Sequence, residues 1–131
     1  MSALTEAQAH LAKAREFLDA AELSLDVDLY NAATSNAVIS GINSKDAACL
    51  RLTGTTAKTE NHSTAVTELR TAGANGPYSE ATNQMATTLG RLLKLKSKSQ
   101  YQTLEVARAD ATKAVDWSQK MLEAASEVVR E

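Results

Sequence analysis

The chain has 131 residues and a formal net charge of −2, which suits one domain of ordinary size and argues against a general nucleic-acid binder, since those are usually basic. Aromatic residues make up 4% of the chain, and one proline and five glycines favour helices over sheet. The single Cys49 excludes an internal disulfide. Because no apolar run approaches the ~18 residues of a membrane span and no signal segment opens the chain, we expect one cytoplasmic domain over residues 1–131, without membrane association.

The first amphipathic stretch is a helix candidate that ends at Asp26. Its apolar stripe alternates by four and three residues and consists of Ala7, Leu11, Ala14, Leu18, Ala21 and Leu25. Thr5 and Gln8 have the spacing of a capping box at its start. His10 has no histidine or cysteine nearby, so we expect it on the surface rather than at a metal. The short link at 26–28 predicts an antiparallel hairpin with the next helix.

The stretch from Asp28 to Gly54 is predicted to be the central helix. Its apolar and small residues recur on more than one face, so the helix should pack on several sides. Asp28 is a good N-cap and Gly54 a good residue just past the C-terminal end. Gly41 costs roughly 1 kcal/mol against alanine in a helix, which is understandable if another element presses against it.

The second half of the chain contains three more helix candidates. A short one lies near 61–71, and a strong turn signal follows at 72–78. The next helix starts at Ser79 and runs to about Lys96, and a polar break at 97–102 precedes a last helix that begins between residues 104 and 108. The sequence therefore predicts an all-α, up-and-down bundle of four or five helices.

A polar seam runs along the predicted central helix, where Asn36, Ser40 and Asn43 fall on one face beside Gly41. Asparagine is unfavourable in the middle of a helix, so the seam suggests hydrogen bonding. The seam can be the exposed side, part of a helix contact in the core, or a contact between two copies of the chain.

A basic cluster closes the fourth predicted helix and consists of Arg91, Lys94, Lys96 and Lys98, with Tyr101 beside it. Cations complement the helix dipole there at roughly 0.3–1 kcal/mol each. The alternative is a patch that binds phosphates and stacks a base on the tyrosine. His62 lies near a helix start without a readable partner acid, which favours a structural role over a catalytic one. No phosphate loop, metal-ligand motif or nucleophile elbow appears, so we expect no cofactor and no metal.

Four segments together resemble HEPN domains, which are small prokaryotic helical bundles named for a proposed nucleotide-binding role. Residues 14–21 and 29–37 are similar to the opening hairpin of that family. Asn61-His62-Ser63 is similar to the Thr-His-Ser step that opens its third helix, and residues 89–101 are similar to its Leu-x-x-Leu-x-x-x-Arg-x-x-x-Asp-Tyr segment. The resemblance covers nearly the whole chain and implies a helical bundle that pairs as a homodimer.

Catalytic members of that family are ribonucleases, often toxins paired with a nucleotidyltransferase-like antitoxin, and act through Arg-x4-6-His. This sequence has Lys96 and Tyr101 at the matching positions, and Asn36 and Asn43 where relatives often carry Arg and His. Lysine lacks the bidentate fork of arginine, and a tyrosine with a pKa near ~10 is a poor general base at neutral pH.

The resemblance therefore implies a non-catalytic HEPN-like protein that binds a nucleotide, an RNA or a protein partner such as a nucleotidyltransferase. The alternative is a metal-independent RNase toxin that uses Lys96, Tyr101 and His62 in place of the usual pair. A purely structural interaction protein is the third interpretation.

Overall fold

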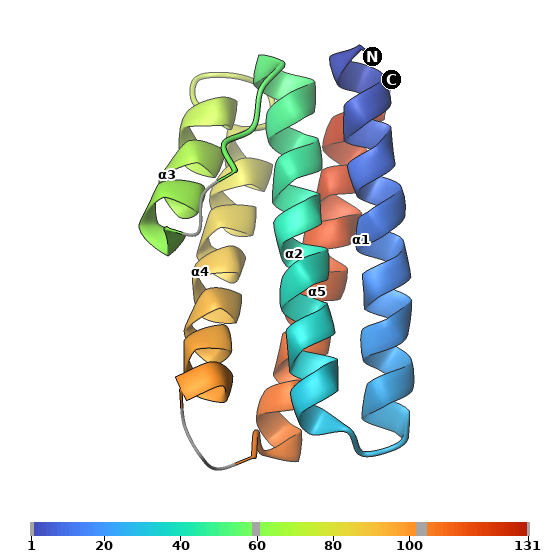
Figure 1. Cartoon of the computed structure of the whole chain (residues 1–131). Helices are drawn as coiled ribbons and strands as arrows, with labels where there is room; N and C mark the ends of the chain where they lie inside the picture. The colour runs from blue at the N-terminus through green and yellow to red at the C-terminus, as the bar shows by residue number, and fades with distance from the viewer. Residues whose placement is uncertain (1, 59–60, 102–104, 131) are drawn as a thin grey trace.

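The structure is a computed structural model that describes residues 2–58, 61–101 and 105–130. Five helices follow one another along the chain: α1 (Ala3–Asp26), α2 (Tyr30–Thr53), α3 (His62–Gly73), α4 (Ser79–Tyr101) and α5 (Arg108–Val129). The described residues contain no strand. The long helices alternate up and down, α3 lies beside α4, and the two termini meet at one end (Figure 1). The predicted all-α bundle is confirmed.

The helix ends show where sequence signals succeeded and where they failed. Gly54 has a φ of 81° and ends α2 as predicted. Asp28 was expected to cap α2, but its own φ of 63° places it in the turn, and the helix begins two residues later. The expected capping box at Thr5 is also wrong, because Ser2 is the N-cap and its hydroxyl accepts from the backbone N–H of Thr5 at 3.1 Å.

The fourth helix is longer than expected. The polar residues 97–101, predicted as a break, continue α4 to Tyr101. Polar composition marks exposure, and nothing in that stretch is a glycine or proline that would end a helix. Lys98, which was predicted to lie in the break, is therefore on the same helix as the rest of the basic cluster.

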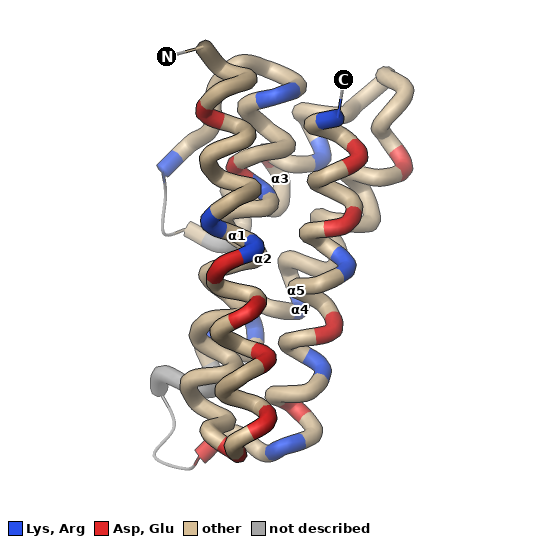
Figure 2. The backbone as a smooth tube through the Cα atoms, turned by 90° about the vertical axis from the view of Figure 1, so that its right-hand side faces the viewer, with Lys and Arg blue, Asp and Glu red and all other residues tan. Residues whose placement is uncertain are grey.

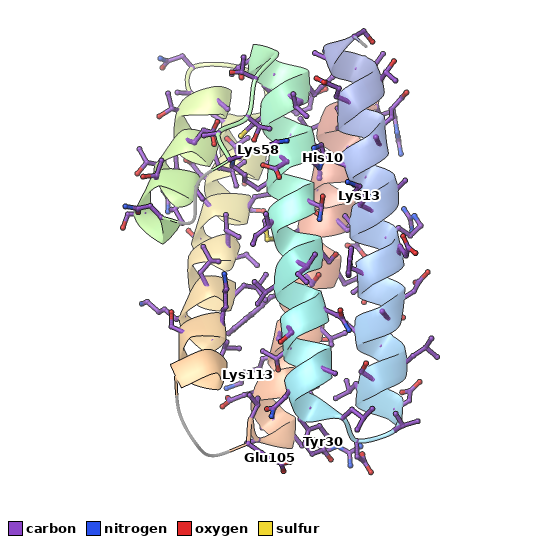
Figure 3. All side chains as sticks on the ribbon, in the orientation of Figure 1. His10, Lys13, Tyr30, Lys58, Glu105 and Lys113 are labelled. Carbon is purple, nitrogen blue, oxygen red and sulfur yellow. The ribbon has the colours of Figure 1, made fainter. Side chains whose placement is uncertain are left out.

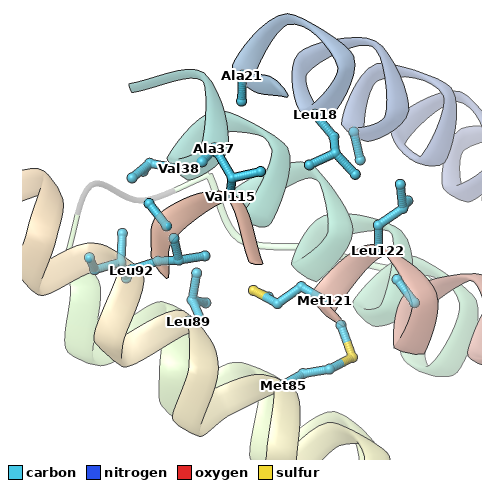
Figure 4. Close-up of a cluster of buried hydrophobic side chains, with 14 of the residues drawn as sticks. Leu18, Ala21, Ala37, Val38, Met85, Leu89, Leu92, Val115, Met121 and Leu122 are labelled. Carbon is cyan, nitrogen blue, oxygen red and sulfur yellow. The ribbon is translucent and has the colours of Figure 1, made fainter. Parts of the chain in front are cut away.

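Helix α2 lies at the centre, as predicted, and contacts all four other helices (Figure 1). Fully buried alanines on α1 and α2 let these two backbones approach closely. On the other side of α2, larger side chains from α4 and α5 fill the core: Met85, Leu89, Leu92, Met121 and Leu122 (Figure 4). Burying each such side chain contributes about 1.5–3 kcal/mol, so most of the stability comes from this core.

Gly41 lies where these helices converge. A Cβ at this position would lie 2.8 Å from Leu92 Cδ1 and 3.3 Å from Met121 Sδ. Both neighbours belong to the same chain, so the close approach inferred from this glycine occurs inside the subunit.

Among the described helices, none combines the length and hydropathy that a membrane span requires.

Candidate ligand-binding site

The feature that stands out beside the core is a buried lysine on α2. Lys45 is 2% exposed, and its ammonium group has four oxygen partners. It donates to Thr56 Oγ1 at 2.9 Å, to the carbonyl of Ala57 at 3.1 Å and to Asp46 Oδ1 at 3.2 Å, and it forms an ion pair with Glu68 of α3. We call this set the Lys45 clip. It joins α2, α3 and the connection between them.

The positive charge of Lys45 in the clip is balanced by the carboxylates of Asp46 and Glu68. Burial alone would favour neutral Lys45, but the hydrogen bond to Glu68 and the charge of Asp46 outweigh it, so the pKa of Lys45 is raised above 10.5. Asp46 also accepts a 2.6 Å hydrogen bond from Thr56, and Glu68 Oε2 accepts the backbone N–H of Ala57 at 2.9 Å. The clip therefore fixes residues 54–58, which we call the strap, against α2.

A hollow of about 390 Å³ opens beside the clip, and we call it the α2–α4 hollow. Its wall is apolar, with Ile42 from α2, Ala65 from α3, and Leu89 and Leu93 from α4. Its polar rim consists of Lys45, Asp46, Lys58, Asn61 and Lys96. The combination of an apolar wall with a few convergent polar groups is typical of a small-molecule site.

The basic cluster predicted at the end of α4 does not converge on one spot. Lys96 is half-buried and lines the α2–α4 hollow, whereas Arg91 and Lys94 are exposed. Arg91 instead flanks a depression on the outer face of α3 and α4, together with Arg70. Five residues along a helix turn the side chain by about 140°, which explains why Arg91 and Lys96 lie on different sides. The side chains of Lys98 and Tyr101, and that of His62, lie outside the described residues.

The polar seam of α2 is divided between core and rim. Ser40 is fully buried and donates to the carbonyl of Ala14 on α1 at 2.7 Å, and Gly41 is buried beside it. Asn36 is half-buried. Asn43 is half-buried too, and its Nδ2 donates to the carbonyl of Ile39 at 3.0 Å. Ser40 and Gly41 thus pack inside the subunit.

His10 is not the free surface residue that we expected. Its Nδ1 lies 2.8 Å from Asn43 Oδ1 and 4.0 Å from Asp46 Oδ2, and its side chain is 22% exposed. Because the amide nitrogen of Asn43 already donates to Ile39, its oxygen accepts here, so Nδ1 of His10 carries the proton. Within the described residues, no group of three or more His, Cys, Asp or Glu side chains is placed to hold a metal ion.

The sequence interpretation missed the clip, although one signal was present. Lys45 lies four residues after Gly41 and four before Cys49, so it falls on the same buried stripe as both. A lysine on such a stripe needs an acidic partner, which Asp46 supplies next to it. Glu68 and Thr56 could not be found this way, since the fold alone brings them to Lys45.

These features describe an all-α bundle with a hollow at its central helix that has an apolar wall and a polar rim. The family model of the HEPN domain matches residues 7–128. The chain therefore belongs to the HEPN domain family, as its four segments suggested. Among curated proteins, none matches the chain significantly.

Proposed function

We propose that this HEPN protein binds a nucleotide-type ligand in the α2–α4 hollow and does not cleave RNA. The observation that carries the proposal is the pairing of an apolar wall with lysines at one rim. The apolar wall of Ile42, Leu89 and Leu93 can pack against the base of a nucleotide. Lys58 and Lys96 can bind the phosphates of the nucleotide as point charges. A volume of about 390 Å³ lies within the ~300–1,000 Å³ range of small-ligand sites.

The absence of cleavage follows from the chemistry at the matching positions. Lys96 stands where catalytic relatives carry arginine, and Tyr101 stands where they carry histidine. Lysine supplies a positive charge but not the planar, bidentate hydrogen-bond donors of arginine. Tyrosine keeps its proton at neutral pH and so cannot act as the general base there. This set of residues favours binding over proton transfer.

The test uses two lysines of the same helix as a matched pair. Lys96→Gln should weaken the binding of adenosine and guanosine 5′-phosphates by about tenfold, the size of one hydrogen bond to a charged group. Lys94→Gln removes the same charge two residues away, on an exposed position, and should change affinity by less than ~2-fold. Calorimetry at low salt measures both, and affinity should fall as salt rises.

Two results would contradict the proposal. Equal losses in the two variants would show that general charge, not the hollow, attracts the ligand. RNA cleavage by nuclease-free wild type that is lost in Tyr101→Phe would instead favour the RNase toxin, because only a proton-transfer group is removed.

A second candidate function, binding of a protein partner, is favoured by the turn between α1 and α2. Three large apolar side chains are exposed there: Leu23 at 66%, Val27 at 63% and Leu29 at 57%. A second copy of this chain or a nucleotidyltransferase-like protein can cover them. If a second copy does, light scattering at tens of micromolar should give twice the subunit mass of 14.0 kDa, and Leu23→Glu with Val27→Glu should return the monomer mass. A wild-type mass equal to that of one subunit would exclude the homodimer.

A further inference from the structure

A second hollow lies on the other side of the strap, between it and α1. This hollow, which we call the α1 groove, has a volume of about 440 Å³. Lys13 and His10 line it from α1, and Thr55, Thr56 and Lys58 line it from the strap, with Glu6 as its one lining carboxylate. His10, Lys13 and Lys58 lie at the same level of the bundle (Figure 3).

The charges of the α1 groove favour an anion. Two lysines against one glutamate leave a net positive charge. Across the part of the chain that the structure describes, neither Lys13 nor Lys58 has a carboxylate within salt-bridge distance. Asp46 is half-buried and lies 4.0 Å from Nδ1 of His10, but it is already held by Lys45 and Thr56 and so adds little negative charge to the groove. Unpaired lysines at a concave surface are available for a ligand.

The polar groups of the groove are also held in place. His10 donates from Nδ1 to Asn43, so its other ring nitrogen, Nε2, is the one left for the groove. The Lys45 clip holds Thr56 and Ala57 of the strap. The backbone that leads into Lys58 is therefore fixed as well. Groups that are ordered before binding lose little entropy when a ligand arrives.

From this geometry we propose that the α1 groove is a second phosphate-binding site, whose lining shares only Lys58 with that of the α2–α4 hollow. Lys13 and Lys58 supply the charge, the Thr55 hydroxyl donates a hydrogen bond, and Nε2 of His10, which has a lone pair because Nδ1 carries the proton, accepts a hydrogen bond from a P–OH group of the ligand. Lysine binds phosphate as a point charge with rotatable donors, which fits a tetrahedral anion better than a planar carboxylate. The ligand class is a phosphate monoester or inorganic phosphate.

The experiment uses the full chain and inorganic phosphate as the probe, followed by nuclear magnetic resonance at low salt. Phosphate should shift the Nε2 signal of His10, assigned by its loss in His10→Gln, and the amide signals of residues 54–58. Lys13→Gln should weaken phosphate binding by about tenfold, as expected for one charge-assisted contact. Lys113→Gln, which removes an exposed lysine at the far end of α5, should leave the affinity within ~2-fold (Figure 3).

The variant Lys96→Gln separates this site from the proposed nucleotide site. It should leave the binding of inorganic phosphate unchanged, since Lys96 does not line the α1 groove. A phosphate affinity that falls in Lys96→Gln and not in Lys13→Gln would place the anion in the α2–α4 hollow and overturn the second site. Equal losses in Lys13→Gln and Lys113→Gln, or no shift of the His10 signal at saturation, would overturn it as well. The affinity for glucose 6-phosphate is measured in the same way. If it exceeds the affinity for inorganic phosphate, the ligand is a phosphate monoester, and if it does not, the ligand is free phosphate.

Discussion

Two positions one helical turn apart on α2 are buried by opposite means. At Gly41 the neighbours are the ends of Leu92 and Met121, and the contact is dry and apolar. At Lys45 the neighbours are oxygens from Asp46, Thr56, Ala57 and Glu68. Both positions lie on the same face of the helix, so the difference comes from what covers that face. Long helices cover the first, and the strap and the short helix α3 cover the second.

This comparison explains why the candidate sites occur where they do. The apolar part is filled by side chains of α4 and α5 (Figure 4). The polar part is covered by a strap that is fixed at its clip and leaves space on both sides, one hollow toward α4 and one toward α1. The lower half of α1, in contrast, carries several acidic positions (Figure 2), and Glu16, Asp19, Glu22 and Asp26 are exposed. An anionic ligand is therefore expected at the strap end of the bundle and not at the acidic end.

The largest expected effect concerns the clip. Lys45→Met leaves Glu68 and Asp46 partly buried without their cation, and breaking such a pair costs ~3–5 kcal/mol. Urea denaturation should show this loss, whereas Lys113→Met, at an exposed site, should change the free energy of unfolding by under ~0.5 kcal/mol. The double variant Lys45→Met with Glu68→Leu should recover part of the loss. A Lys45→Met cost below ~1 kcal/mol would mean that the clip does not hold α3 to α2.

The next effect concerns the apolar position. Gly41→Leu places bulk where even a Cβ would lie 2.8 Å from Leu92, so we expect a destabilisation of about 1–3 kcal/mol or more. The matched control is Gly90→Ala on α4, whose nearest neighbour would be Val66 Cγ2 at 3.9 Å. That variant should gain roughly 0.5–1 kcal/mol, because alanine is the better helix former and nothing blocks it. Thermal unfolding of both variants measures the contrast, and a stable Gly41→Leu would contradict the close packing.

Much of the fold could be predicted from the sequence, because it depends on periodicity. The stripe on α1 and the small residues of α2 specify which faces are buried, and Gly54 specifies where α2 ends. The errors occurred at Thr5 and Asp28, which are not the N-cap residues of α1 and α2, and after Lys96, where α4 continues. Local end signals compete over one or two residues, so they are weaker than periodicity.

The candidate sites were less predictable. Lys96 was identified, and the structure places it at the α2–α4 hollow, but its sequence neighbours Arg91 and Lys94 lie elsewhere. His10 was assigned to the surface because its partner Asn43 is 33 residues away in the chain. Lys13 and Lys58 had no sequence signal at all. Contacts between distant residues depend on the tertiary fold, and periodicity carries no information about them.

The smallest expected effect is a loss of stability at alkaline pH, and it again compares the apolar and polar parts of α2. Burial raises the pKa of the Cys49 thiol from 9.0 to about 12, so the folded chain favours the neutral thiol. Its contribution is complete below pH 9.0 and is lost as the pH rises toward 12. The charged form of Lys45 is stabilised by folding, so its contribution is complete below pH 10.5 and is lost above it.

The two windows can be separated with Cys49→Ala. Between pH ~8 and ~10, the wild type should lose on the order of 1 kcal/mol more than Cys49→Ala, because only the wild type has a buried thiol whose deprotonation opposes folding. Above pH 10.5, both proteins should lose stability further as Lys45 loses its proton. Urea midpoints across this range measure the difference. Parallel curves from pH ~8 to ~10 would show that the thiol deprotonates as easily in the folded chain as in the unfolded one, which its full burial argues against.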